Sequence, residues 1–271
     1  MPELPEVETS CRGIRPHIEG QVLEQVTVRN GRLRWPVPEA ELLALQGKRL
    51  EAVTRRGKYI KLIFNSGYVL LHLGMSGNVR IVKASESVLK HDHIDFAFTN
   101  GNILRLNDPR RFGCCLYQEG LDQEHGLLGV LGPEPLSEAF DAELLWQRSR
   151  GKKQAVKTFI MDSHVVVGVG NIYAAEALFR AGINPKRAAG NISKKRYIVL
   201  TDAIKTVLAA AIEQGGTTLK DFVGSDGKPG YFKQELQVYG RVGEPCNICG
   251  KNIKNVNLGQ RSTFYCGSCQ K

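Results

Sequence analysis

No apolar segment of the sequence approaches the ~18 consecutive residues that a membrane-spanning helix requires. Residues 1–8 are acidic and lack the apolar core that a secretory signal needs. We therefore expect a cytoplasmic protein with no membrane partner. Internal repeats and low-complexity tracts are also missing, and a content of 42% apolar and 24% charged residues is typical of a folded globular chain.

Acidic residues are in short supply. The chain has 27 Asp and Glu residues against 37 Lys and Arg residues, which leaves a net charge of +10. An excess of this kind favours a polyanionic partner, with nucleic acid ahead of an anionic membrane surface. The plain alternative is a protein that is basic for solubility alone.

The spacing of apolar residues changes along the 271-residue chain from helical periodicity to short β-rich runs and back, which predicts an α+β protein with more than one domain. Apolar residues recur at helical spacing from Val7 to Ile18, and Gly20 is placed to end this N-terminal helix. Short β-rich runs separated by turn residues then predict a β-sandwich. These runs are 22–28, 59–64, 68–73, 79–82, 94–98, 103–106 and 113–117.

A Gly-Pro-Glu-Pro break at residues 132–135 separates this region from a helical one. Helical periodicity covers 138–150, 171–181 and 194–213. The expected domains are therefore 1–131, 132–240 and a cysteine-rich end at 241–271. The glycine-rich segment 215–231 has no periodicity and is a candidate lid, with a simple disordered connection as the alternative.

Four of the seven cysteines lie close to the end of the chain, as two Cys-x2-Cys pairs with residues 250–265 between them. This spacing predicts one tetrahedral zinc site at the base of a short hairpin, with Cys246, Cys249, Cys266 and Cys269 as ligands. Four thiolates leave no open position for water, so the zinc is expected to be structural. Arg261 lies on the expected hairpin arm, where its guanidinium can reach a phosphate. The other three cysteines are expected to pack as small apolar residues.

The first residues carry a possible nucleophile. Met1 precedes a small residue, so its removal is expected, and Pro2 would then carry a free secondary amine. An α-amino group has a pKa of ~7.7–8.0 against ~10.4 for a lysine side chain, so more of it is neutral at physiological pH. Such an amine attacking a sugar C1′ gives an iminium that keeps its positive charge and can drive elimination of a phosphate. Glu3 stands beside it as a possible proton donor.

Four motifs together resemble a known family. They are Met-Pro-Glu-Leu-Pro-Glu-Val-Glu-Thr at 1–9, Asp-Pro-Arg-Arg-Phe-Gly at 108–113, Val-Gly-Val-Gly-Asn-Ile-Tyr-Ala at 167–174, and the four-cysteine end. The chain resembles the formamidopyrimidine-DNA glycosylases over its whole length. The resemblance implies a β-sandwich domain with an N-terminal helix, a domain of helix, two turns and helix, and a zinc-ribbon hairpin. It implies excision of oxidised purines from damaged double-stranded DNA by a monomer, followed by strand cleavage through β,δ-elimination.

The resemblance also implies roles for single residues. Pro2 would be the Schiff-base nucleophile, Glu3 the general acid, Lys58 the proton donor for β-elimination, and Arg261 its counterpart in δ-elimination. His91, Lys152 and Asn171 would contact the DNA, with Asn171 at the start of a helix that grips its backbone. Met75, Arg110 and Phe112 would fill the gap left by the extruded nucleotide. Gly151 departs from the basic residue that many relatives carry at its position.

Two other functions remain open on the sequence alone. One is an endonuclease VIII-type enzyme for oxidised pyrimidines, although that branch typically has Gly where this chain has Leu4. The other is a zinc-ribbon protein that binds DNA without chemistry at Pro2. Borohydride trapping and a panel of damaged duplexes distinguish the three.

Overall fold

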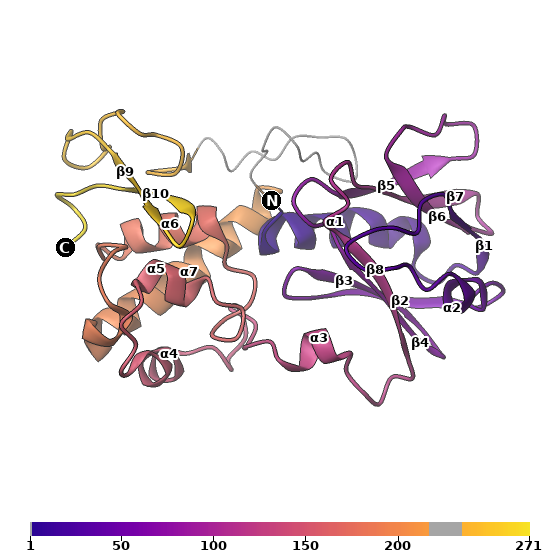
Figure 1. Ribbon diagram of the computed structural model, residues 1–271, viewed down its shortest axis with the longest axis horizontal. Coiled ribbons are helices and arrows are strands. Elements are labelled where there is room, and N and C mark those ends of the chain that lie inside the picture. Colours follow the sequence, from indigo (N-terminus) through magenta and orange to yellow (C-terminus); the bar gives the residue numbers. More distant parts are fainter. Residues whose placement is uncertain (1, 217–234) are drawn as a thin grey trace. The chain divides into compact units, whose positions relative to one another are not determined.

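A computed structural model of the chain describes residues 2–216 and 235–271. These residues form two compact units (Figure 1), which are described separately. The first unit holds residues 2–129 and 214–216, and the second holds residues 130–213 and 235–271. Most of the candidate lid at 215–231 lies outside the described residues, so the lid stays a prediction.

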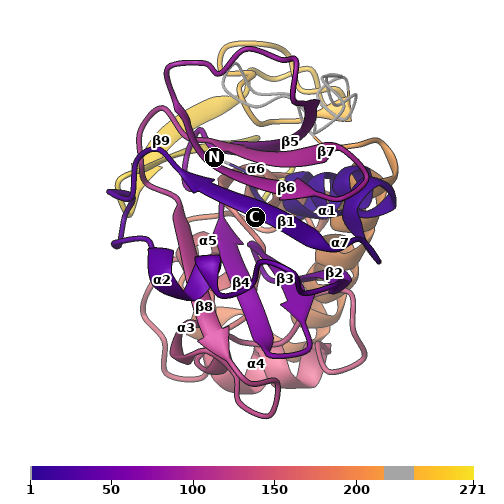
Figure 2. The ribbon, with the colours of Figure 1, turned by 90° about the vertical axis from the view of Figure 1, so that its right-hand side faces the viewer.

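The first unit is the predicted β-sandwich with an N-terminal helix. Two four-stranded antiparallel sheets, with strand orders β1-β6-β7-β5 and β2-β3-β4-β8, face each other as layers (Figure 2). The core between them takes apolar side chains from both sheets. The strands are β1 Leu23–Val28, β2 Leu50–Arg56, β3 Tyr59–Phe64, β4 Gly67–His72, β5 Asn78–Lys83, β6 Asp92–Phe98, β7 Asn102–Asn107 and β8 Cys114–Glu119.

Seven of these eight strands coincide with the predicted runs, and β2 is the one that sequence reasoning missed. Only Leu50 and Val53 of β2 are buried, and the strand ends in two arginines, so its apolar pattern is weak. Two short helices, α2 Glu39–Leu43 and α3 Gly126–Gly129, were also not predicted.

The N-terminal helix, α1 Leu4–Ile18, buries one apolar stripe against the sandwich and contacts β2, β3, β5 and β7. Val7, Cys11 and Ile14 belong to this stripe and are at most 1% exposed. Burial raises the pKa of the Cys11 thiol to about 12, and its sulfur donates to the Thr54 carbonyl at 3.6 Å. Cys11 is therefore an inert packing residue, as expected.

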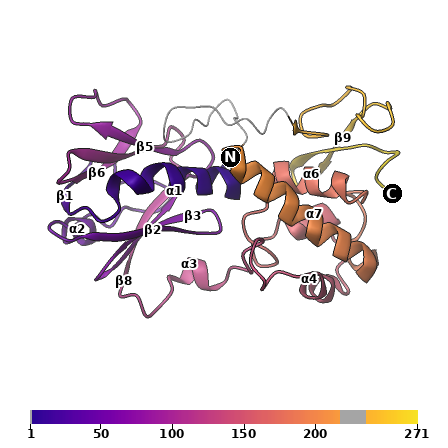
Figure 3. The same ribbon diagram turned by 180° about the vertical axis from the view of Figure 1, so that it is seen from behind.

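The second unit is helical and ends in a β-hairpin. The long helix α7 contacts both α4 and α6 (Figure 3). Strand β10 of the hairpin packs on α6. The elements are α4 Ala142–Ser149, α5 Val156–Ile160, α6 Asn171–Arg180, a 3-10 turn Ala189–Asn191, α7 Lys194–Glu213, β9 Lys254–Leu258 and β10 Arg261–Tyr265. The first helix starts later than predicted because the Asp141 carboxylate accepts from the Leu144 N–H at 2.7 Å and caps it.

No described helix combines the length and the apolar character needed to cross a membrane.

Candidate functional site

Pro2 and Glu3 lie directly before α1, and both are buried, with Glu3 2% exposed. The Glu6 carboxylate, one turn into the helix, accepts a hydrogen bond from the Glu3 N–H at 2.9 Å. The Glu3 carboxylate accepts from the Glu6 N–H in return, which completes a capping box. The two hydrogen bonds satisfy backbone donors at the helix start and fix the backbone of Glu3. The proposed nucleophile and the proposed acid therefore sit on a capped, anchored helix end.

Lys58 lies in the two-residue turn between β2 and β3, where Arg56 pairs with Tyr59. Gly57, the first turn residue, has φ +57°, a conformation that glycine adopts without strain. The Arg55 guanidinium donates to the Gly57 carbonyl at 2.8 Å and to the Glu8 carboxylate of α1 at 2.9 Å. The turn that carries Lys58 is thus tied to the helix that follows Pro2.

Glu8 remains charged in this link. Burial alone would raise the pKa of Glu8, but hydrogen bonds and charge from Arg55 and Arg12 hold it below its ordinary value. The ion pair between α1 and β2 therefore persists at physiological pH.

A pocket of roughly 320 Å³ lies in the first unit and is lined by Arg34, His72, Gly74, Met75 and Phe112. His72, which sequence reasoning missed, accepts from the Gly74 N–H through Nδ1 at 2.9 Å. Burial, together with the positive charges of Lys58 and Arg34, lowers the pKa of His72 to about 4. The ring is therefore neutral at physiological pH, with its proton on Nε2, and offers this pocket a hydrogen-bond donor.

Met75 and Phe112 are carried by two loops that cross at close range. Gly74 has φ +61°, and a Cβ there would lie 2.5 Å from the Gly113 backbone nitrogen, so the crossing requires glycine. Phe112 is 53% exposed and stands outside the core, whereas Met75 is half-buried. Arg110 is exposed on the same loop as Phe112.

His91 precedes β6 and is half-buried. Its carbonyl accepts from the Asp108 N–H at 3.0 Å, so it is joined to the start of the loop that carries Arg110 and Phe112. The first unit therefore carries seven of the residues singled out in the sequence. They are Pro2, Glu3, Lys58, Met75, His91, Arg110 and Phe112.

Asn171 is the first residue of α6, as the motif predicted. Its side-chain oxygen accepts from the ammonium of Lys157, which is 1% exposed. The Asn171 side chain is half-buried, and its amide nitrogen is a hydrogen-bond donor at the helix start. This geometry suits a phosphate contact at a helix N-terminus.

Lys157 is a second residue that sequence reasoning missed. Its ammonium also donates to the Ser262 carbonyl at 2.9 Å and to the Thr263 hydroxyl at 2.8 Å. It thereby joins α5, the start of α6 and strand β10. Its neighbours Val156, Phe159 and Ile160 give the segment an apolar pattern, but nothing in the sequence marks the lysine as buried.

Arg261 follows the two-residue turn of the β9–β10 hairpin and is exposed, as predicted. Both turn residues have positive φ, +54° at Gly259 and +60° at Gln260, which matches the right-handed twist of a tight hairpin. A pocket of roughly 300 Å³ lies beside Arg261 and reaches Lys157. Lys152 is exposed and follows α4 in the same unit.

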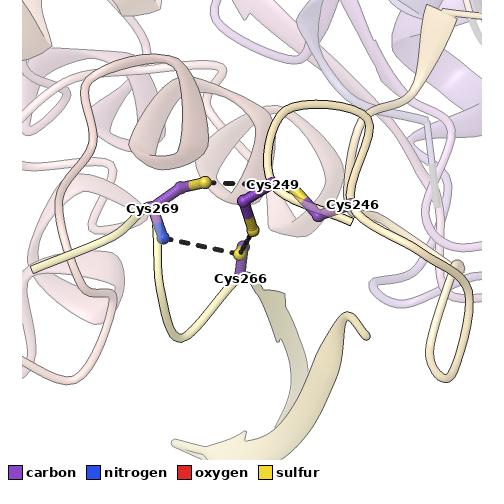
Figure 4. A group of neighbouring side chains, drawn as sticks. All are labelled: Cys246, Cys249, Cys266 and Cys269. Carbon is purple, nitrogen blue, oxygen red and sulfur yellow. Dashed lines mark hydrogen bonds between the residues drawn. The ribbon is translucent and has the colours of Figure 1, made fainter. Parts of the chain in front are cut away.

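The four cysteines near the chain end form one cluster in which all sulfur atoms lie within 4.8 Å of one another (Figure 4). The Cys246 and Cys269 sulfurs are 3.9 Å apart, and those of Cys249 and Cys266 are 3.5 Å apart. Zn–S bonds of about 2.3 Å in a tetrahedron place sulfurs about 3.8 Å apart. The cluster fits a structural zinc ion with all four positions filled by protein.

Three family models match successive parts of the chain. The formamidopyrimidine-DNA glycosylase N-terminal domain matches residues 1–115, the H2TH domain of the same family residues 131–223, and the zinc finger found in FPG and IleRS residues 243–271. The chain belongs to the formamidopyrimidine-DNA glycosylase family. This result and the cysteine cluster confirm the predicted family, fold class and structural zinc.

Individual relatives are similar over full length. Proteins named formamidopyrimidine-DNA glycosylase from Idiomarina loihiensis and Alcanivorax borkumensis are 60% and 58% identical, with 100% of each chain covered. Among solved structures, the MutM (FPG) protein of Thermus thermophilus has a TM-score of 0.89 at 37% identity, covering 99% of this chain and 98% of that chain. A Lactococcus lactis FPG mutant in complex with Fapy-dG containing DNA has a TM-score of 0.93 at 32% identity, covering 100% of both chains.

Proposed function

We propose that the chain is a DNA glycosylase and AP lyase that removes oxidised purines from duplex DNA and then cuts the strand. Its substrates are 8-oxoguanine and formamidopyrimidines. The observation that carries the proposal is the buried Pro2–Glu3 pair on a capped helix, linked through Glu8 and Arg55 to the turn that bears Lys58. Two comparisons support the proposal. The chain is 60% identical over its full length to a formamidopyrimidine-DNA glycosylase, and its structure is similar to that of a relative in complex with Fapy-dG containing DNA.

Pro2 acts after removal of Met1. Its amine attacks C1′ of the damaged nucleotide, the C1′–N bond breaks, and the base leaves with a proton supplied by Glu3. The C1′–O4′ bond then breaks, and the proton released by the attacking amine passes through the Glu3 carboxylate to O4′, which opens the sugar ring and forms an iminium. This iminium has no N–H proton to lose, so it stays an electron sink. Loss of the C2′ proton then expels the 3′ phosphate with help from Lys58, and a second elimination expels the 5′ phosphate with help from Arg261.

The remaining site residues bind DNA. His91, Lys152 and Asn171 contact phosphates, which supply affinity without sequence preference. Met75, Arg110 and Phe112 fill the stack when the damaged nucleotide rotates out, because the glycosidic bond is hidden in an intact duplex. The zinc ion, when bound, stabilises the hairpin that carries Arg261 and takes no part in the chemistry.

We further propose that the enzyme works as a cytoplasmic monomer with three domains, 1–131 for catalysis, 132–240 for DNA binding and 241–271 for zinc. One monomer carries every residue assigned above, so no second copy is needed for the reaction.

Incubation with duplexes that contain 8-oxoguanine, a formamidopyrimidine or an oxidised pyrimidine tests the function. We expect cleavage of the two purine substrates, with phosphate left on both strand ends. Glu3→Gln should bind the same duplexes and fail to release the base. Cleavage of the pyrimidine substrate alone would favour the endonuclease VIII-type activity, and binding without cleavage would favour a zinc-ribbon DNA-binding protein.

A further inference from the structure

Asp108 is a buried carboxylate to which the proposed mechanism gives no role. It is 1% exposed and lies between β7 and the loop that carries Arg110 and Phe112. One oxygen accepts from the Gly113 N–H at 2.7 Å, and the other accepts from the Arg110 N–H at 3.3 Å. The carboxylate therefore binds both ends of the 110–113 loop.

The same carboxylate reaches a second loop. The Ser76 hydroxyl, 5% exposed, donates to Asp108 at 3.4 Å, and Ser76 is the neighbour of Met75. The two loops also cross at Gly74 and Gly113, where a Cβ on either glycine would lie within 2.5 Å of the opposing backbone. A shift of one loop is thus transmitted to the other.

The backbone of Asp108 adds a third connection. Its N–H donates to the His91 carbonyl at 3.0 Å, and its carbonyl accepts from the buried His93 ring at 2.8 Å. That carbonyl also accepts from the Arg111 N–H at 3.2 Å. Arg111 has φ +57°, a conformation that persists in a non-glycine residue only where surrounding contacts enforce it.

We propose that Asp108, with Ser76, is a positioning residue that holds Met75, Arg110 and Phe112 in one fixed arrangement, so that they enter the duplex as a unit. The inference rests on the proposed role of these three residues in filling the gap. Asp108 is 1% exposed and acts through these hydrogen bonds. Its carboxylate fixes the backbone that carries the inserted side chains. The hydrogen bond from the Asp108 N–H to the His91 carbonyl also positions these side chains relative to His91, which is proposed to contact a phosphate.

Asp108→Asn tests the coupling because the side chain keeps its size and loses one acceptor. The amide nitrogen must then face a donor, either the Gly113 N–H or the pair formed by Arg110 N–H and Ser76 hydroxyl. Ser76→Ala is a milder variant that removes only the link between the loops. Asp122→Asn, at an exposed acidic residue of the first unit, is the matched control for loss of one negative charge.

Three measurements on the zinc-loaded full chain are informative together. They are single-turnover excision of 8-oxoguanine from a duplex, cleavage of a duplex with a preformed abasic site, and fluorescence of 2-aminopurine placed beside the lesion to follow extrusion. We expect Asp108→Asn to slow excision and extrusion by about tenfold or more, corresponding to loss of one charge-assisted hydrogen bond. Abasic-site cleavage should change by less than about threefold. Ser76→Ala should show the same selectivity with a smaller effect.

Equal slowing on both substrates, or no slowing on either, overturns the inference for Asp108. If Asp108→Asn does not fold, as judged by thermal unfolding, Ser76→Ala decides by the same criterion. Met75→Ala and Phe112→Ala report on the underlying proposal, since they must slow excision selectively if these residues fill the gap. A selective loss in these two variants without one in Asp108→Asn refutes the positioning role alone, whereas a wild-type chain that cuts neither duplex refutes the proposed function.

Discussion

Replacing Lys157 by methionine removes a buried ammonium while keeping most of the side-chain volume. The substitution breaks three hydrogen bonds, to Asn171, Ser262 and Thr263, that join α5, α6 and β10. Because the Thr263 hydroxyl itself donates to the Arg261 carbonyl at 3.2 Å, the change extends to the residue assigned to δ-elimination.

The cost depends mainly on Thr263. This residue is 0% exposed, so no water replaces the lost donor, and an unsatisfied buried group costs ~1–3 kcal/mol. Asn171 and Ser262 are partly or fully exposed, and water can replace the ammonium there at a smaller cost. Removal of the ammonium also removes its desolvation penalty, which offsets part of the loss. We expect a net destabilisation of about 2 kcal/mol, or roughly 30-fold in the unfolding equilibrium.

Urea unfolding of the zinc-loaded full chain measures this effect, with Lys195→Met as the control because Lys195 is an exposed lysine of the same unit. Affinity for an undamaged duplex should fall in Lys157→Met as well, since Asn171 loses the partner that orients its amide. Unfolding at the same urea concentration as the control would show that the ammonium contributes no net stability and would refute the reasoning.

Three further predictions follow from named contacts. Cys249→Ser should release zinc, measured with a colorimetric chelator, and weaken duplex binding. Binding as tight as that of wild type would show that the hairpin is not part of the DNA interface. Lys152→Ala should weaken binding to every duplex and reduce the slope of log affinity against log salt by about one, and an unchanged slope would contradict a phosphate contact. His72 has a pKa of about 4, below its ordinary ~6.5, so the unfolded chain binds more protons and wild-type stability falls as pH drops through this window. Between pH 7 and pH 5 the free energy of unfolding, measured with urea, should fall by ~2 kcal/mol less in His72→Asn, which keeps an acceptor for the Gly74 N–H, than in wild type. An equal fall in both proteins would contradict this assignment.

The sequence predicted correctly those helices and strands in which apolar residues recur with a clear helical or strand period. Helix α7 has the bounds that the sequence predicted, and β3 alternates buried and partly buried residues over its predicted length. The zinc site was predictable because two Cys-x2-Cys pairs with residues 250–265 between them have the spacing of a four-thiolate zinc site. Strand β2 was missed because pairing with β3, and not its own two buried residues, keeps it in the sheet.

The site was predictable only in part, and family resemblance carried most of it. Resemblance marked Pro2, Lys58 and Arg261, but it did not supply the contacts that orient them. Those contacts come from residues distant in sequence, such as Lys157 with Thr263 and Asp108 with Ser76. The residue type alone does not indicate whether a lysine or an aspartate is buried, so only the fold shows that Lys157 and Asp108 are.

The most direct test of the account is to identify the atom of the protein that attacks the sugar. The chain is incubated with an 8-oxoguanine duplex and borohydride, the covalent adduct is digested, and the DNA-linked peptide is sequenced by mass spectrometry. We predict a peptide that begins at Pro2, lacks Met1 and carries the sugar on the proline nitrogen. Attachment at Lys58 or another lysine, or a full yield of adduct from a chain that retains Met1, would contradict the central claim.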